Sequence, residues 1–201
     1  MNSDQEANIK ASVLALGQNL ACAWSYFFLL RGFDQGRRQD TEVVKRFGLL
    51  YDRAWCAIFD GFFAKVGTLL DNTKGTHSLP NLIILIRRYG SPELKRLLPE
   101  VESCLTKKDT PLQKLKNWRH DAVAHDAADR AAEFHIDNRM TLTEIEDALT
   151  QLEGLLNQLS WNVLAIHNDT RSGFESLVED GKSLFACAAA GIRNAASDSE
   201  A

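Results

Sequence analysis

The sequence predicts an all-α protein, a bundle of long antiparallel helices with shorter connecting helices. Apolar residues recur every three or four positions over most of the 201-residue chain, and this spacing places them on one face of an α-helix. Typical helix-capping residues precede several of these stretches, and no segment alternates polar and apolar residues for long enough to predict a β-strand. We expect residues 1–170 to form one helical bundle domain, and residues 171–201 to add a C-terminal helix packed on it with a frayed tail.

The first long apolar stretch, residues 11–30, carries no charge, so it could form either a membrane span or a buried helix. Gln18 and Asn19 lie at its middle, where a helix exposed to lipid would hold them at a cost in free energy. The apolar residues in and beside this stretch follow helical spacing: Ile9, Val13, Leu16, Leu20, Trp24 and Phe27. We therefore predict a buried amphipathic helix and no membrane partner. The polar N-terminus does not resemble a secretory signal, so we expect a cytoplasmic protein.

Two further long helices are predicted. Residues 40–71 have two apolar stripes side by side, and a helix that is apolar over so much of its circumference must be covered on more than one side. It is either the central helix of the bundle or part of a subunit interface. Residues 141–168 hold a strict heptad of apolar residues, and Thr141 with Glu144 forms the pattern of a capping box at its start.

Shorter helices are indicated by their first residues. Ser91 and Thr110 each precede a proline, and Ser172 stands three residues before a glutamate, so each is a candidate N-cap. The helices predicted from these signals span residues 79–88, 92–104, 111 to about 123, and 173–193. Residues 33–40 and 71–78 are rich in polar residues and glycine, and we expect both to be loops.

Charge and cysteine placement restrict the class of protein. Residues 74–120 hold ten basic and four acidic residues, a net charge of +6, whereas residues 121–201 hold five and fifteen, a net charge of −10. A basic block of this kind can attract a polyanion locally, although solvated helix faces would have the same composition. The four cysteines form no C-x-x-C pair, which argues against a zinc ribbon or a disulfide framework. We expect them to be small buried side chains.

The segment RHDAVAHDA, residues 119–127, concentrates titratable groups at the end of the helix predicted from residue 111. Asp121 and His125 are four residues apart and would share a helix face, so the carboxylate could accept a hydrogen bond from one imidazole nitrogen. Alanine and valine fill the remaining positions and would let a substrate or a second backbone approach. The alternative is structural: arginine and histidine are favoured near helix C-termini in any case, where they interact with the helix dipole.

The spacing Arg-x5-His in NWRHDAVAHDA, at the end of a capped helix, resembles the signature of the HEPN superfamily and especially of its abortive-infection branch. The resemblance extends to residues 58–86, which are similar to the long helix, short polar loop and following helix of that branch. It implies a dimerising helical bundle and, in active members, a metal-independent endoribonuclease. Arg119 and His125 match the two signature positions as catalytic residues, and His120 matches the polar residue after the arginine. One toxin subgroup has a tyrosine two residues after the histidine, whereas this chain has Ala127.

The residue types suit this chemistry independently of the resemblance. A histidine titrates near neutral pH and can move the protons of an RNA cleavage, and an arginine can stabilise the charge on the phosphorane. Asp121 and His120 are expected to support the site, and four lysines are expected to bind RNA: Lys107, Lys108, Lys114 and Lys116. The histidine and aspartate spacing in the motif does not match known metal sites, so we expect neither a metal nor a cofactor.

The partners follow from the same interpretation: an RNA substrate, a second copy of the chain, and an antitoxin or nucleotidyltransferase. The setting would be phage defence or a toxin–antitoxin system. The alternative function is a catalytically inactive HEPN module that binds RNA, nucleotide or a partner protein. A ribonuclease assay in EDTA distinguishes the two.

Overall fold

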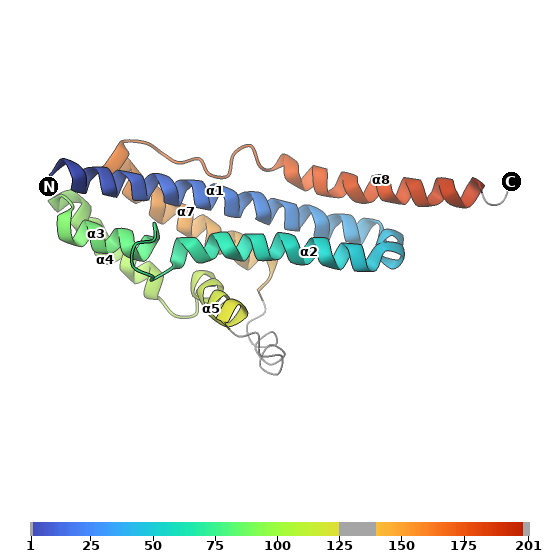
Figure 1. Ribbon diagram of the computed structural model, residues 1–201, viewed down its shortest axis with the longest axis horizontal. Coiled ribbons are helices and arrows are strands. Elements are labelled where there is room, and N and C mark those ends of the chain that lie inside the picture. Colours follow the sequence, from blue (N-terminus) through green and yellow to red (C-terminus); the bar gives the residue numbers. More distant parts are fainter. Residues whose placement is uncertain (1, 125–139, 199–201) are drawn as a thin grey trace. The chain divides into compact units, whose positions relative to one another are not determined.

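Seven α-helices and no strand occur in the residues that the computed structural model describes, which are 2–124 and 140–198 (Figure 1). For residues 118–124 and 195–198 the backbone alone is described. The helices are α1 (Ser3–Gln39), α2 (Thr41–Leu70), α3 (Leu79–Tyr89), α4 (Pro92–Thr106), α5 (Pro111–Ala124), α7 (Leu142–Leu164) and α8 (Ser176–Asp198). Along the described residues, two long helices are followed by three shorter ones and then by two longer ones, and the predicted all-α fold is confirmed.

Helix α1 buries the face that its apolar spacing predicts. The six predicted residues are each at most 1% exposed: Ile9, Val13, Leu16, Leu20, Trp24 and Phe27. By length and composition alone α1 could also cross a membrane, but half of its most apolar stretch is buried inside the protein. A core helix of a soluble protein can have the same length and apolar composition, so these two properties of α1 do not require a membrane.

The predicted loop at residues 33–40 is wrong, because α1 continues as a helix to Gln39. The ring of Phe33 stacks on Tyr51 at a centroid distance of 6.3 Å. Asp34 is the next residue, and its carboxylate pairs with Arg37 at 3.0 Å and with Arg38 at 2.7 Å. These aromatic contacts and ion pairs keep a polar, glycine-containing segment helical although its composition is typical of a loop.

Helix α2 is kinked at Phe47, whose φ and ψ of −119° and 30° are not helical. After the kink its C-terminal part is covered: Phe62, Val66 and Leu69 are at most 3% exposed. Near the kink α2 is open, since Leu49 is 74% exposed and Leu50 is 70% exposed, although Val43 before the kink is buried. The wide apolar surface predicted for residues 40–71 is therefore buried at the C-terminal end of the helix and exposed near the kink.

Helices α4 and α5 begin directly after the caps predicted for them. The hydroxyl of Ser91 accepts a hydrogen bond from the backbone N–H of Leu94 at 3.3 Å, and that of Thr110 accepts one from Gln113 at 3.2 Å. Ser78 caps α3 in the same way. Helix α3 packs on α4, and α4 and α5 both pack on α7. The loop predicted for residues 71–78 is confirmed.

Helix α7 begins with the predicted capping box, in which Thr141 and Glu144 bind each other's backbone N–H groups. Its heptad residues from Ile145 to Leu159 are buried. The helix ends at Leu164 rather than at the predicted residue 168, because Ala165 adopts the left-handed conformation with φ of 53°. The chain then returns along α7.

Helix α8 begins at Ser176, three residues later than predicted. Gly173 has a φ of +89°, which a right-handed helix cannot include, so Ser172 lies in a turn and does not cap α8. Phe185 and Ala189 of α8 form a small core with Val43 of α2.

Contacts between Cα atoms divide the chain into two units. The first unit comprises Met1–Ala23 and Phe63–Thr170, and the second comprises Trp24–Phe62 and Arg171–Ala201. Helices α1 and α2 each contribute residues to both units. The division into domains 1–170 and 171–201 stays a prediction.

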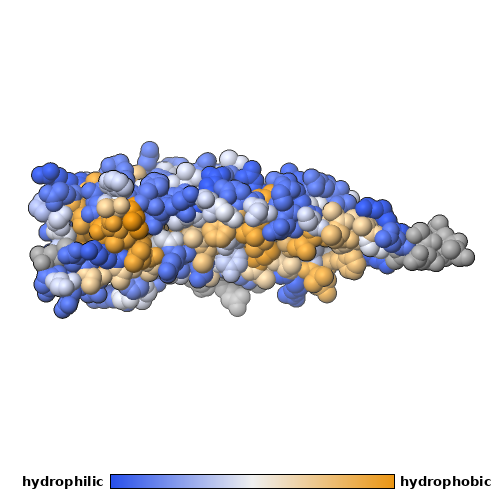
Figure 2. Space-filling model, turned by 90° about the horizontal axis from the view of Figure 1, so that it is seen from above, coloured by the Kyte–Doolittle hydropathy of each residue, from blue (hydrophilic) through white to orange (hydrophobic). Residues whose placement is uncertain are grey.

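The surface of the protein is not uniformly polar. On the face drawn in Figure 2, apolar side chains gather in patches between polar ones. The four cysteines are free, and Cys56 and Cys187 are exposed, so the expected burial is wrong for these two.

Candidate functional site

The first residues of the candidate catalytic motif lie on α5. The backbone is helical from Pro111 to Ala124, so Arg119, His120 and Asp121 stand in the second half of this helix. Their side chains are not among those that the structure describes, and His125 lies outside the described residues. The structure therefore shows how the motif's helix is held, and the geometry of the Arg119 and His125 pair stays a prediction.

The first half of α5 is anchored in the core of the first unit. Leu112 is 2% exposed and Leu115 is fully buried, and the helix packs against α7 and α4. The amide of Gln113 also donates a hydrogen bond to Asn117 at 2.8 Å, one turn later. Burial of two leucines fixes the rotation of α5 about its axis, because an apolar face stabilises the helix only in the direction of the core.

An ion pair connects the start of α5 to the start of α7. The ammonium of Lys114 lies 2.6 Å from a carboxylate oxygen of Glu144. This hydrogen bond from Lys114, together with one from the Thr141 backbone, lowers the pKa of Glu144 below its ordinary value. Glu144 thus has two functions, since it completes the capping box of α7 and holds the helix that bears the motif.

The register of α5 gives the direction of the motif's first residue. Arg119 follows Leu115 by four residues, so its position lies one turn further along the face that buries Leu112 and Leu115. The position of His120 is rotated by about 100° from that face. The helical backbone therefore points the Arg119 position and the His120 position in different directions.

The four lysines expected to bind RNA have different environments. Lys107 and Lys108 are exposed in the turn between α4 and α5, and within the described part of the chain neither forms an ion pair. Lys116 is half-buried. Lys114 is neutralised by Glu144, so it is the least available of the four to an RNA phosphate.

Among the side chains that the structure describes, the other titratable groups do not form a second polar site. His77 shares a hydrogen bond of 3.0 Å with the buried hydroxyl of Ser12, and a ring nitrogen of His167 lies 3.4 Å from the Asn157 amide. In residues 2–124 and 140–198, no three His, Cys, Asp or Glu side chains come together in a way that could hold a metal ion.

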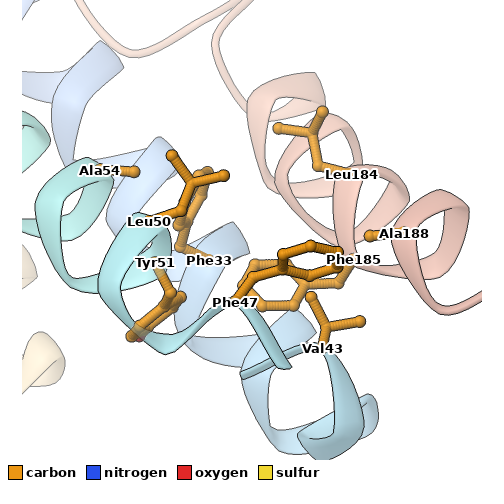
Figure 3. A pocket seen from close by; sticks show the side chains of 9 residues that line it. All are labelled: Phe33, Val43, Phe47, Leu50, Tyr51, Ala54, Leu184, Phe185 and Ala188. Carbon is orange, nitrogen blue, oxygen red and sulfur yellow. The ribbon is translucent and has the colours of Figure 1, made fainter. Parts of the chain in front are cut away.

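The sequence alone did not predict an apolar groove in the second unit. Its volume is about 430 Å³, and it is lined by Phe33 of α1, by Val43, Phe47, Leu50, Tyr51 and Ala54 of α2, and by Leu184, Phe185 and Ala188 of α8 (Figure 3). Burial raises the pKa of the Tyr51 phenol. The apolar stripes of residues 40–71 were a sequence feature that could have indicated the α2 wall of this groove. The α8 wall could not be anticipated, because it depends on where α8 packs.

Comparison with models of protein families matches residues 6–184 to the HEPN family described as AbiU2. A search of curated proteins and a search of solved structures each found no match. The matched residues include α1 from residue 6 onward, α2 to α5 and α7, and they extend into α8. Since the match spans most of the 201 residues, the chain belongs to the AbiU2 family, an abortive-infection branch of the HEPN superfamily.

Proposed function

We propose that this abortive-infection HEPN protein is a metal-independent endoribonuclease that acts as a homodimer. The observation that supports the proposal most is the place of the Arg-x5-His spacing. Arg119 and His125 fall inside the residues matched to the family, and Arg119 lies in the second half of a helix whose start is capped, buried and ion-paired. A catalytic pair needs such a support, because small displacements of reacting groups cost large factors in rate.

The reaction is attack of the RNA 2′-hydroxyl on the adjacent phosphorus. An unprotonated His125 accepts the 2′-hydroxyl proton as the new P–O bond forms, and a protonated histidine donates a proton to the 5′-oxygen as the P–O5′ bond breaks. The guanidinium of Arg119 stabilises the extra negative charge on the phosphorane. The products are a 2′,3′-cyclic phosphate and a 5′-hydroxyl, so no water or oxidant is consumed in this step.

A dimer contains two copies of His125, so one copy can act as the base and the other as the acid. In a twofold dimer each copy contributes an Arg119 and a His125, and the two imidazoles can hold different protonation states. Asp121 orients the imidazole of His125, and His120 positions the substrate. Lys107 and Lys108, exposed in the turn before α5, bind flanking phosphates without reading sequence.

The proposed setting is the cytoplasm, in phage defence or a toxin–antitoxin system. A ribonuclease of this kind requires control, and an antitoxin or a nucleotidyltransferase partner would provide it. The RNA is the substrate, and the reaction as written uses neither a metal nor a cofactor.

The purified protein, incubated with structured RNA in EDTA, tests the proposal. We expect fragments that end in a 2′,3′-cyclic phosphate, and we expect none from the His125→Ala protein. His167→Ala is a matched control, because His167 is an exposed histidine after α7 and is not part of the motif. Intact RNA over a range of pH and protein concentration would instead favour a catalytically inactive module that binds RNA, nucleotide or a partner.

A further inference from the structure

The apolar groove of the second unit has no partner in the described residues. Phe33, Tyr51 and Phe185 form its floor through mutual ring contacts, with centroid distances from 5.5 to 6.3 Å. Leu50 and Leu184 stand on opposite walls, one on α2 and the other on α8 (Figure 3). The floor is fixed by aromatic packing, so the groove is a preformed feature of this unit.

The walls of the groove are too open for a small ligand. Phe47 is 42% exposed, Leu50 is 70% exposed and Leu184 is 59% exposed. Sites for small molecules bury about 70–90% of the ligand surface, which requires walls that enclose it. An open groove with large apolar walls instead has the form of a site that receives the apolar face of a helix.

The α2 side of the groove carries two exposed arginines near Leu50, and the α8 side carries one exposed aspartate, Asp180, one turn before Leu184. Arg46 and Arg53 are exposed on α2, before and after Leu50, and among the described residues neither guanidinium forms an ion pair. Neighbouring cations are already paired, since Lys45 binds Glu42 at 2.6 Å. Two unpaired arginines beside an apolar groove favour a ligand that brings carboxylates next to its apolar face.

We propose that this groove binds an amphipathic helix of a partner protein, one with an apolar stripe flanked by acidic side chains. The apolar side chains of the partner helix enter between Leu50 and Leu184. Its carboxylates pair with Arg46 and Arg53, which are seven residues apart on α2, on either side of the kink at Phe47. The partner needs at least two acidic residues along its flank to reach both arginines.

The same charges disfavour a second copy of this chain as the occupant. In a twofold contact centred on the groove, Arg46 and Arg53 of both copies would enter one interface, where like charges repel. A partner with acidic flanks has no such cost. The proposed occupant of this groove therefore differs from the second copy that the candidate ribonuclease site requires.

Binding of two synthetic helical peptides to the full-length protein tests the proposal. Both peptides carry the same leucine stripe; one has glutamates at the two flanking positions and the other has lysines there. Fluorescence anisotropy should show binding of the glutamate peptide, with a dissociation constant about tenfold or more below that of the lysine peptide. In a protein with both Arg46→Glu and Arg53→Glu, the preference should reverse.

Substitutions in the walls locate the binding. Leu50→Asp and Leu184→Asp should each weaken binding about tenfold or more, because each places a carboxylate in the apolar groove. Ile84→Asp is the matched control, since Ile84 is also an exposed aliphatic residue but lies on α3. Both wall residues are exposed, so circular dichroism should show that these variants stay folded.

Three results would overturn the proposal: no binding of the glutamate peptide, equal binding of both peptides, or binding that survives Leu50→Asp and Leu184→Asp. A dimer that dissociates on Leu50→Asp would also overturn it, because a second copy would then occupy the groove. Ribonuclease activity does not enter these measurements, so their outcome is independent of the proposed function.

Discussion

The ammonium of Lys114 lies 2.6 Å from the carboxylate of Glu144, and this ion pair joins the helix that bears Arg119 to the start of α7. The two residues are thirty positions apart in the sequence. The contact therefore fixes α5 from outside the motif, and it suggests that the candidate site depends on residues that take no part in chemistry.

This ion pair should make a small and pH-dependent contribution to stability. The pKa of Glu144 is lowered in the folded protein, so the contribution is fully present above the unfolded value of about 4.3 and is lost as the pH falls through the folded pKa. Lys114→Met and Glu144→Gln, with the double variant, should give a coupling energy of about 0.5 kcal/mol at neutral pH, since both side chains are partly exposed. Urea unfolding measures it. A coupling unchanged at pH 3 would contradict this account.

Replacement of the motif residues should separate activity from stability. Arg119→Ala and His125→Ala should abolish RNA cleavage and change the free energy of unfolding by no more than about 0.5 kcal/mol. Asp121→Ala should reduce cleavage to an intermediate level, because it loosens the imidazole without removing it. Cleavage assays and thermal unfolding on the same proteins provide both quantities.

The opposite pattern would identify the motif as a helix end. Arg119→Ala and His125→Ala would then each lower stability by about 0.3–1 kcal/mol through lost dipole interactions, and any cleavage would not depend on them. Arg88→Ala is a control for the loss of an arginine near a helix end, since Arg88 lies in the last turn of α3. Activity that survives in the His125→Ala protein would reject the catalytic assignment.

The packing of α8 on α1 should depend on Gly181. A Cβ atom at this position would lie 2.9 Å from the Gly32 backbone, which a helix cannot easily move. Gly181→Ala should therefore destabilise the protein by about 1–3 kcal/mol, as overpacking does elsewhere. Chemical unfolding followed by circular dichroism measures the change.

Gly191→Ala is the matched control on the same helix. A Cβ atom there meets nothing within 4 Å, so the substitution should stabilise α8 by about 0.5–1 kcal/mol through its higher helix propensity. Equal effects of the two substitutions would show that α8 and α1 do not approach closely at Gly181.

The proposed composite site requires a dimer. Light scattering at micromolar concentration should give a mass near twice the 22.5 kDa of the chain. A mass near 22.5 kDa under these conditions would remove the argument for catalytic groups from two chains. The fold and the family membership would be unaffected.

The sequence by itself determined the helices and their buried faces where the evidence is local. Helical spacing identified the face of α1 from Ile9 to Phe27, and side-chain capping identified Ser91, Thr110 and Thr141 as helix starts. These features could be predicted because a cap or a helix face is defined by residues within a few turns of one another. The Arg119 and His125 spacing was visible for the same reason.

The tertiary structure decided which apolar surfaces are covered and which polar residues are paired. Residues 33–40 have the composition of a loop, yet Phe33 packs on Tyr51 and Phe185, and α1 continues to Gln39. The apolar face of α2 is buried at Phe62 and open at Leu50, a difference that its periodicity does not contain. Burial and ion pairing depend on segments that are distant in the chain. A local sequence pattern cannot specify which distant segment packs against a given helix face.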